Sequence, residues 1–257
     1  MMALERKNPL SINFKYRGIR KATMEEKKYS NAKRAITIIS LLTAFVAGFE
    51  LFMAFSHYQP GMSICDVASH VSRDNLIVYF LLLIIANIVF LPAALLLYKE
   101  NGISLKDEIY DKKTLWKDIL YGVIAFVVAE IAGLITDIKN YIPGIKATEL
   151  ACARSETGIS VTVLGFIALV LVSGILKEIY FRGLAKRFCG PVFGEITALL
   201  LSNVLFAVFD WHNLGHSFII GLVWIYAYKK TGHLITPMIC HVGAGLYYVT
   251  YTVIALI

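Results

Sequence analysis

Long apolar runs, separated by short polar stretches rich in charge, dominate this 257-residue chain. Most runs are about as long as an α-helix must be to cross the hydrocarbon core of a bilayer, roughly 20 residues. We therefore predict an all-α fold, a polytopic membrane helix bundle of about seven transmembrane helices (six to eight). The expected spans are residues 35–56, 76–98, 119–136, 159–181, 193–211, 214–228 and 234–256.

Composition agrees with a membrane protein. The chain is 58% hydrophobic and 17% charged, whereas a soluble domain carries about 25% charged residues. Residues 1–34 form a basic segment, which we expect to be a cytoplasmic N-terminal tail, and residues 35–257 are expected to form one membrane-embedded domain. The net charge of +7 does not indicate nucleic-acid binding, because the basic residues follow the loops of the predicted bundle.

The distribution of lysine and arginine predicts which side of the membrane each loop occupies. Alternate loops on the side of the N-terminus hold ten, five, two and two basic residues, nineteen in all, and the opposite loops hold four. Cytoplasmic loops carry the excess of such residues. The bias therefore predicts a multi-pass protein of the cell membrane with a cytoplasmic N-terminus. Gly190-Pro191 is expected to break the chain after the fourth span, and Thr231-Gly232 to turn it after the sixth.

Three ionisable side chains interrupt the fourth apolar run: Lys177, Glu178 and Arg182. Glu178 and Arg182 are four residues apart, so they share one helix face and can pair. Charges at membrane depth are costly and usually mark function. Two interpretations stay open at this point: a functional site, or a structural ion pair with Lys177 extending to the membrane surface.

Two further segments resemble, together with this one, a known family. Glu178-x-x-x-Arg182-Gly183 at the end of a membrane helix, Phe206-x-x-x-Asp210, and His241-x-x-x-Gly245 lie on successive parts of the predicted bundle. They are similar to the motifs Glu-Glu-x-x-x-Arg, Phe-x-x-x-His and His-x-x-x-Asn of the CAAX-protease and bacteriocin-processing (Abi, or CPBP) intramembrane endopeptidases. The resemblance covers roughly residues 159–250.

The resemblance implies a role for each matching residue. Glu178 would activate water as the base, Arg182 would orient it, and His241 would donate to the oxyanion. Asp210 or His212 would assist. Asp210-Trp211-His212-Asn213 can equally be a polar helix end at the outer interface.

Three family positions hold other residues. Lys177 replaces the first glutamate, Asp210 replaces the histidine of the second motif, and Gly245 replaces the asparagine of the third. An ammonium group donates where a base must accept. Because buried ions need partners, we predict that Lys177 and Asp210 neutralise each other. This pairing requires the two side chains to lie at one depth, although the predicted spans place them towards opposite ends.

The implied function is peptide-bond hydrolysis within the membrane, close to the C-terminus of a peptide or prenylated protein, or in a bacteriocin-like peptide. The alternative is an inactive family member that binds a membrane partner, as in bacteriocin self-immunity or sensor regulation. The expected partners are membrane lipids and a peptide or lipidated protein. No cofactor is expected, although Glu178, His241 and either Asp210 or His212 are the kinds of ligand that zinc uses. Glu50 and Glu130 also lie at membrane depth, where they could pair with basic residues or line a cavity.

Overall fold

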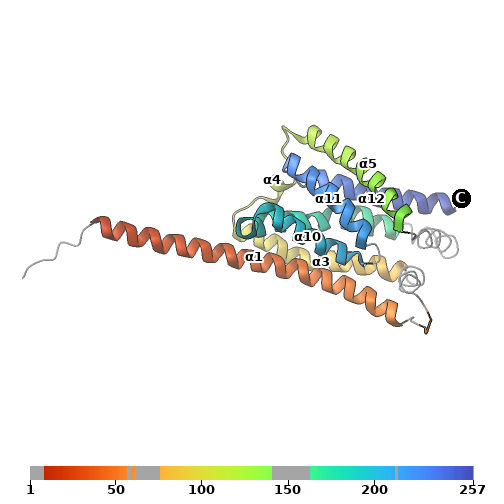
Figure 1. Ribbon diagram of the computed structural model, residues 1–257, viewed down its shortest axis with the longest axis horizontal. Coiled ribbons are helices and arrows are strands. Elements are labelled where there is room, and N and C mark those ends of the chain that lie inside the picture. The colour runs from red at the N-terminus through yellow and green to blue at the C-terminus, as the bar shows by residue number, and fades with distance from the viewer. Residues whose placement is uncertain (1–8, 57–58, 62–75, 141–162, 212–213, 257) are drawn as a thin grey trace, which may run out of the picture.

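The computed structural model describes residues 9–56, 59–61, 76–140, 163–211 and 214–256, and its regular elements in these ranges are all helices (Figure 1). The elements are α1 (Pro9–Ser56), α3 (Leu76–Glu100), α4 (Leu105–Ile109), α5 (Leu115–Asn140), the π-helical segment η1 (Phe166–Ser173), α8 (Gly174–Glu178), the π-helical segment η2 (Ile179–Cys189), α9 (Gly190–Phe193), α10 (Glu195–Phe209), α11 (Leu214–Thr231) and α12 (Ile235–Leu256). The predicted all-α membrane helix bundle is confirmed.

Three of the helices are long and apolar enough to cross a membrane on their own. They cover Thr23–Met53, Ile77–Glu100 and Val163–Phe193, and two shorter apolar helices cover Glu195–Phe209 and Ile235–Tyr247. The predicted spans at 119–136 and 214–228 lie within α5 and α11, which are helical. That all seven segments cross the membrane stays a prediction.

Helix α1 continues through the predicted border between the basic segment and the first span. It is a single helix of 48 residues, and its N-terminal part extends beyond the other helices (Figure 1). Ala35, Leu42 and Val46 on one of its faces are fully buried. Residues 9–34 are therefore a helical extension of the first span.

The fourth predicted span, 159–181, ends too early. The helix that begins at Val163 continues to Phe193 through η1, α8, η2 and α9. Apolar side chains such as Leu184, Ala185 and Phe188 are buried beyond the predicted end and keep this helix against the bundle. The chain reverses at Gly194, whose φ of +85° favours glycine, and not at Gly190-Pro191. The predicted turn at Thr231-Gly232 is present, with a φ of +84° at Gly232.

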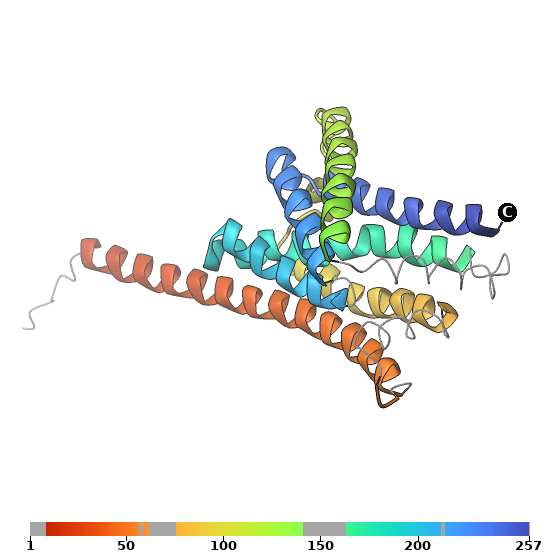
Figure 2. The ribbon, with the colours of Figure 1, turned by 45° about the vertical axis from the view of Figure 1, so that its right-hand side comes forward.

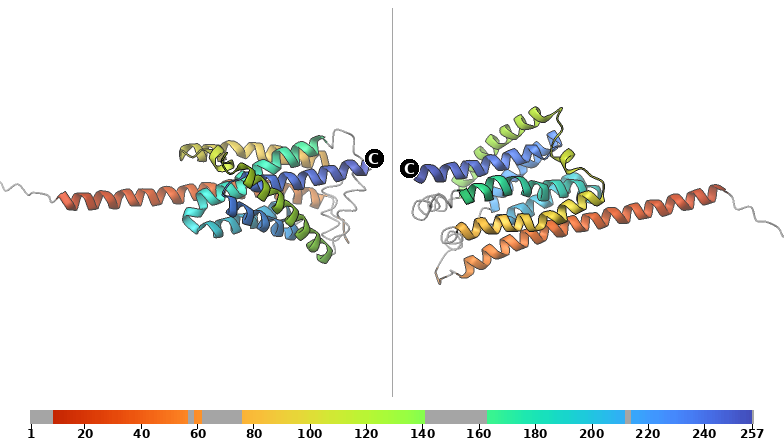
Figure 3. Two further views of the ribbon diagram at one scale, coloured as in Figure 1. Left: turned by 90° about the horizontal axis from the view of Figure 1, so that it is seen from above. Right: turned by 180° about the vertical axis from the view of Figure 1, so that it is seen from behind.

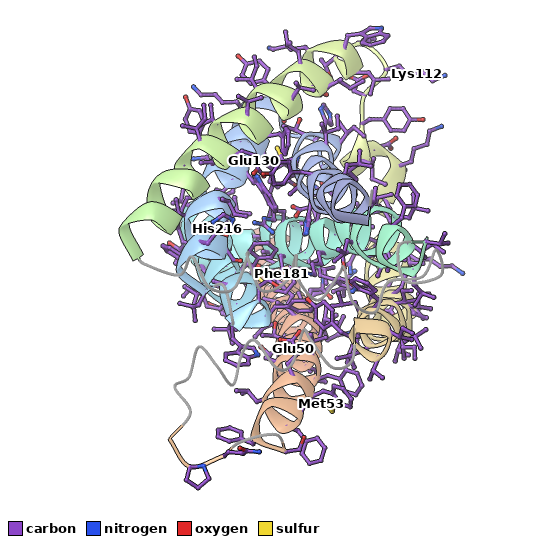
Figure 4. All side chains as sticks on the ribbon, turned by 90° about the vertical axis from the view of Figure 1, so that its right-hand side faces the viewer. Glu50, Met53, Lys112, Glu130, Phe181 and His216 are labelled. Atoms are coloured by element: carbon purple, nitrogen blue, oxygen red, sulfur yellow. The ribbon has the colours of Figure 1, made fainter. Side chains whose placement is uncertain are left out.

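The helices enclose one main core. Helix α1 packs against α3, η2 and α10, while α5 packs against α11 and α12. Helix α5 is steeply inclined to α12 (Figure 2), and α1 and α3 run side by side (Figure 3). Phe181 lies in the middle of the bundle (Figure 4). Large apolar side chains on the outer faces, such as Leu81, Ile85 and Val89 of α3, are exposed, as lipid-facing residues would be.

Candidate active site

Three of the predicted site residues come together in the middle of the bundle. Nδ1 of His241, on α12, lies 2.8 Å from Oε1 of Glu178, on α8. Nη1 of Arg182, on η2, donates to the same oxygen at 3.3 Å. Glu178 and Arg182 are buried, and only a small part of the His241 ring is exposed. One carboxylate oxygen therefore joins a guanidinium and an imidazole.

Two glycines allow α12 to approach this position. A Cβ at Gly174 would lie 2.9 Å from Cγ2 of Val242, the neighbour of His241. A Cβ at Gly245 would lie 3.0 Å from the carbonyl oxygen of Leu169, in η1. Backbone cannot yield as a flexible side chain can. Gly245 stands where the family motif has asparagine, and it also has a structural role. The close contact between α12 and η1 at this position favours a residue without a Cβ.

Arg182 is held by groups from two further helices. Its Nη2 donates to Oδ1 of Asn203 at 3.3 Å, and Nδ2 of Asn203 donates to the carbonyl oxygen of Phe218 at 2.9 Å. The guanidinium carbon lies 4.2 Å from the ring centre of Phe206 and 5.5 Å from that of Trp224. Cations are attracted to aromatic faces at such distances.

Asn203 and Trp224 were not singled out by the sequence analysis. A signal for Asn203 does exist, because an amide in an otherwise apolar helix must find a partner. The indole of Trp224 lies 4.8 Å from the His241 ring, between centres. No pattern in the sequence distinguishes it from an ordinary packing residue.

The second oxygen of Glu178, Oε2, is buried and accepts no hydrogen bond from any described residue. A carboxylate oxygen without a donor is costly in such surroundings. A water molecule or a substrate group that donates to Oε2 would remove this cost. This atom is the chemically open position of the site.

Lys177 is buried next to an aromatic ring. Its Nζ lies 4.1 Å from the ring centre of Phe209. Asp210 caps α10 and accepts a hydrogen bond from Oγ of Ser217 at 3.0 Å. The ammonium of Lys177 thus contacts Phe209, the residue before Asp210, and the pairing of Lys177 with Asp210 stays a prediction.

The longer fourth helix removes the difference in depth between Lys177 and Asp210. Lys177 lies 16 residues before Phe193, and Asp210 lies 15 residues after Glu195. The two residues are therefore separated from the turn at Gly194 by nearly the same number of helical residues. Lys177 is therefore near the middle of its helix and not close to its end.

The remaining predicted residues are less informative. His212 lies outside the described residues. Glu50 of α1 is buried, whereas Glu130 of α5 is half-buried (Figure 4). Within the described ranges, no three His, Cys, Asp or Glu side chains are grouped so that they could hold a metal ion.

Comparison with known families addresses the same segment. A family model described as "Type II CAAX prenyl endopeptidase Rce1-like" matches residues 159–247, about a third of the chain. This segment is similar to the Rce1-like endopeptidases. No curated protein and no solved structure gives a match.

The Rce1-like segment contains Glu178, Arg182 and His241 together with Asn203 and Trp224. The predicted resemblance is thereby confirmed, with nearly the predicted limits. The chain is a membrane protein similar to CAAX-type intramembrane proteases.

Proposed function

We propose that this protein is an intramembrane endopeptidase in which Glu178 activates water. The observation that carries the proposal is the arrangement around this carboxylate. Oε1 is occupied by Arg182 and His241, while the buried Oε2 has no donor among the described residues. A general base must lie within hydrogen-bond reach of the proton that it removes. Oε2 is the atom that can accept from a catalytic water.

The reaction follows from these roles. Water donates a proton to Glu178 as its oxygen bonds to the carbonyl carbon, and the carbonyl oxygen becomes an oxyanion. Collapse of this intermediate breaks the C–N bond, and Glu178 passes the proton to the leaving amine. Arg182 keeps the carboxylate in place. Nδ1 of His241 donates its hydrogen to the Glu178 carboxylate. Nε2 can therefore donate to the oxyanion only when the imidazole is doubly protonated. The rate should therefore fall as the pH rises.

The substrate class follows from the Rce1-like match. We infer a peptide bond near the C-terminus of a prenylated protein or membrane peptide, which would reach the site from the lipid. Multi-pass insertion in the cell membrane with a cytoplasmic N-terminus is part of the proposal. It is supported by the predicted topology, in which nineteen basic residues lie on the side of the N-terminus and four on the opposite side.

The test uses the full chain, purified and reconstituted in liposomes, with a prenylated, internally quenched peptide. Glu178→Gln should lower the rate by about 10²-fold or more, as loss of a general base does. Glu195→Gln is the matched control, because it removes an exposed carboxylate from the same Rce1-like segment. Absence of hydrolysis by the unmodified protein, or an unchanged rate in Glu178→Gln, would refute the proposal.

A second function is favoured by Lys177 and Asp210, which occupy the two positions that activate water in the family. A buried ammonium paired with Asp210 would preserve the fold without supplying a base. In that case the protein binds a membrane peptide, as in self-immunity or sensor regulation, and does not cut it. A photoreactive prenylated peptide distinguishes the two. Equal cross-linking to the unmodified protein and to Glu178→Gln, with no cleaved product from either, supports binding alone.

A further inference from the structure

A cavity of about 460 Å³ lies at the opposite end of the fourth helix from Val163, apart from the buried site. It is formed by the connection between α3 and α5 and by the turn between α11 and α12. Three ammonium groups line it, from Lys106, Lys112 and Lys113, together with Tyr110 and His233. Lys112 lies at the edge of the molecule, away from Phe181 in its middle (Figure 4). The cavity is thus at the surface and mainly basic.

His233 is fixed in the wall of this cavity. Its Nδ1 lies 2.9 Å from Oδ2 of Asp118, which is buried. The hydroxyl of Thr114 donates to the same carboxylate oxygen at 2.8 Å. Nδ1 gives its hydrogen to Asp118, so Nε2 can donate to an anionic ligand only when the imidazole is doubly protonated. A positioned imidazole is a more selective feature than mobile lysines alone.

Two carboxylates also line the cavity, and they limit the charge of the ligand. Oδ1 of Asp111 accepts from the backbone N–H of Lys113 at 2.9 Å, so it stabilises the local turn. Asp107 lies in the first turn of α4. Three lysines against two aspartates leave one positive charge. A singly charged phosphate diester balances this excess. A polyanion would be repelled by the carboxylates of Asp107 and Asp111.

The cavity adjoins a surface that suits the edge of a membrane. The indole of Trp116 is 81% exposed at the start of α5, and Leu120 and Tyr121 follow it as exposed side chains. Tryptophan and tyrosine are enriched at the level of lipid headgroups. The phosphate of a membrane lipid would therefore lie beside Trp116 and within reach of the lysines.

We propose that this cavity binds the phosphate of an anionic phospholipid headgroup. Lys112, Lys113 and Lys106 neutralise the phosphate, and doubly protonated His233, held by Asp118, donates to it from Nε2. The acyl chains extend along the exposed face of Trp116 and Leu120. The inference is independent of the proposed peptidase activity.

The test measures binding of a fluorescent phosphatidylglycerol to the full-length protein in detergent micelles. Lys112→Gln/Lys113→Gln should weaken binding on the order of tenfold, since each basic residue near an anionic lipid surface contributes appreciably. The control is Lys229→Gln/Lys230→Gln, which removes the same charge from exposed residues outside the cavity. It should change the affinity less than about twofold. His233→Gln removes the imidazolium that donates from Nε2 and should therefore weaken binding.

Each outcome decides the inference. An equal loss in both double variants would mean diffuse attraction to surface charge and would overturn it. Unchanged binding in His233→Gln would remove the directed contact and overturn it as well. Competition by millimolar inorganic phosphate, with no preference for the lipid, would identify a free-phosphate site and refute the lipid assignment. Equal affinity for fluorescent phosphatidylcholine would also refute it.

Discussion

Among the described residues, two carboxylate–imidazole pairs of nearly equal length have very different surroundings. Glu178 and His241 are 2.8 Å apart with 0% and 12% of their side chains exposed, and Asp118 and His233 are 2.9 Å apart with 1% and 21%. The first carboxylate also binds Arg182, and the ring of Phe206 packs against both of its partners, Arg182 and His241. The second binds the neutral hydroxyl of Thr114.

The comparison shows that the third group bound to each carboxylate, Arg182 in one pair and Thr114 in the other, determines what the pair can do. At membrane depth a charge needs a countercharge, so Glu178 depends on Arg182, and both depend on the helices that hold Asn203. Asp118 lies in the first turn of α5, where the helix dipole favours a negative charge. Substitutions around the buried pair of Glu178 and His241 should therefore lower the stability of the fold strongly. Substitutions at the peripheral pair of Asp118 and His233 should lower it only slightly.

The largest expected effect is that of Arg182→Met. It leaves the buried Glu178 carboxylate without its cation and removes the ring contacts. Breaking a buried pair from one side costs about 3–5 kcal/mol. The loss should appear as a lower midpoint of thermal unfolding in detergent. Arg187→Met is the control, because Arg187 is exposed and its ion pair with Glu108 is at the surface, where the cost is about 0–1 kcal/mol. Similar midpoints for both variants would contradict the comparison.

The next effect concerns the space around Arg182. A Cβ at Gly221 would lie 2.0 Å from Oδ1 of Asn203 and 3.1 Å from Nη2 of Arg182. Gly221→Ala should therefore displace the amide and destabilise the fold by about 1–3 kcal/mol, as overpacking does. Gly215→Ala, on the same helix with nothing near its Cβ, should leave the stability unchanged or raise it by up to about 1 kcal/mol. A midpoint for Gly221→Ala equal to that of Gly215→Ala would show that the contact yields at no cost.

Much of this arrangement follows from the sequence, for reasons that also set its limits. Hydrophobic run length predicts helices well, and i,i+4 spacing predicts the Glu178–Arg182 pair. The predicted end of the fourth helix was wrong because the charges of Lys186 and Arg187 suggested a loop. In fact Lys186 donates to the carbonyl oxygen of Gly232 while the opposite face stays buried.

Contacts between helices are the part that the sequence does not encode locally. Asn203, Trp224 and Gly221 became part of the site only when α10, α11 and η2 were placed side by side. The pair of Asp118 and His233 joins residues 115 positions apart. A single sequence offers no spacing rule for such a contact.

The smallest effect is expected at this peripheral pair, with Asp118→Asn. The amide keeps the shape and can still accept from Thr114 and His233, but it loses the charge on the shared oxygen. A hydrogen bond to a charged group stabilises more than a neutral one by about 1 kcal/mol, so the unfolding midpoint should fall only slightly. Asp111→Asn is the control, because its exposed carboxylate accepts from a backbone N–H of its own turn and its loss should cost still less. If Asp118→Asn destabilised the protein as much as Arg182→Met, the peripheral carboxylate would be as dependent on its partner as Glu178, and the proposed distinction between the two pairs would be wrong.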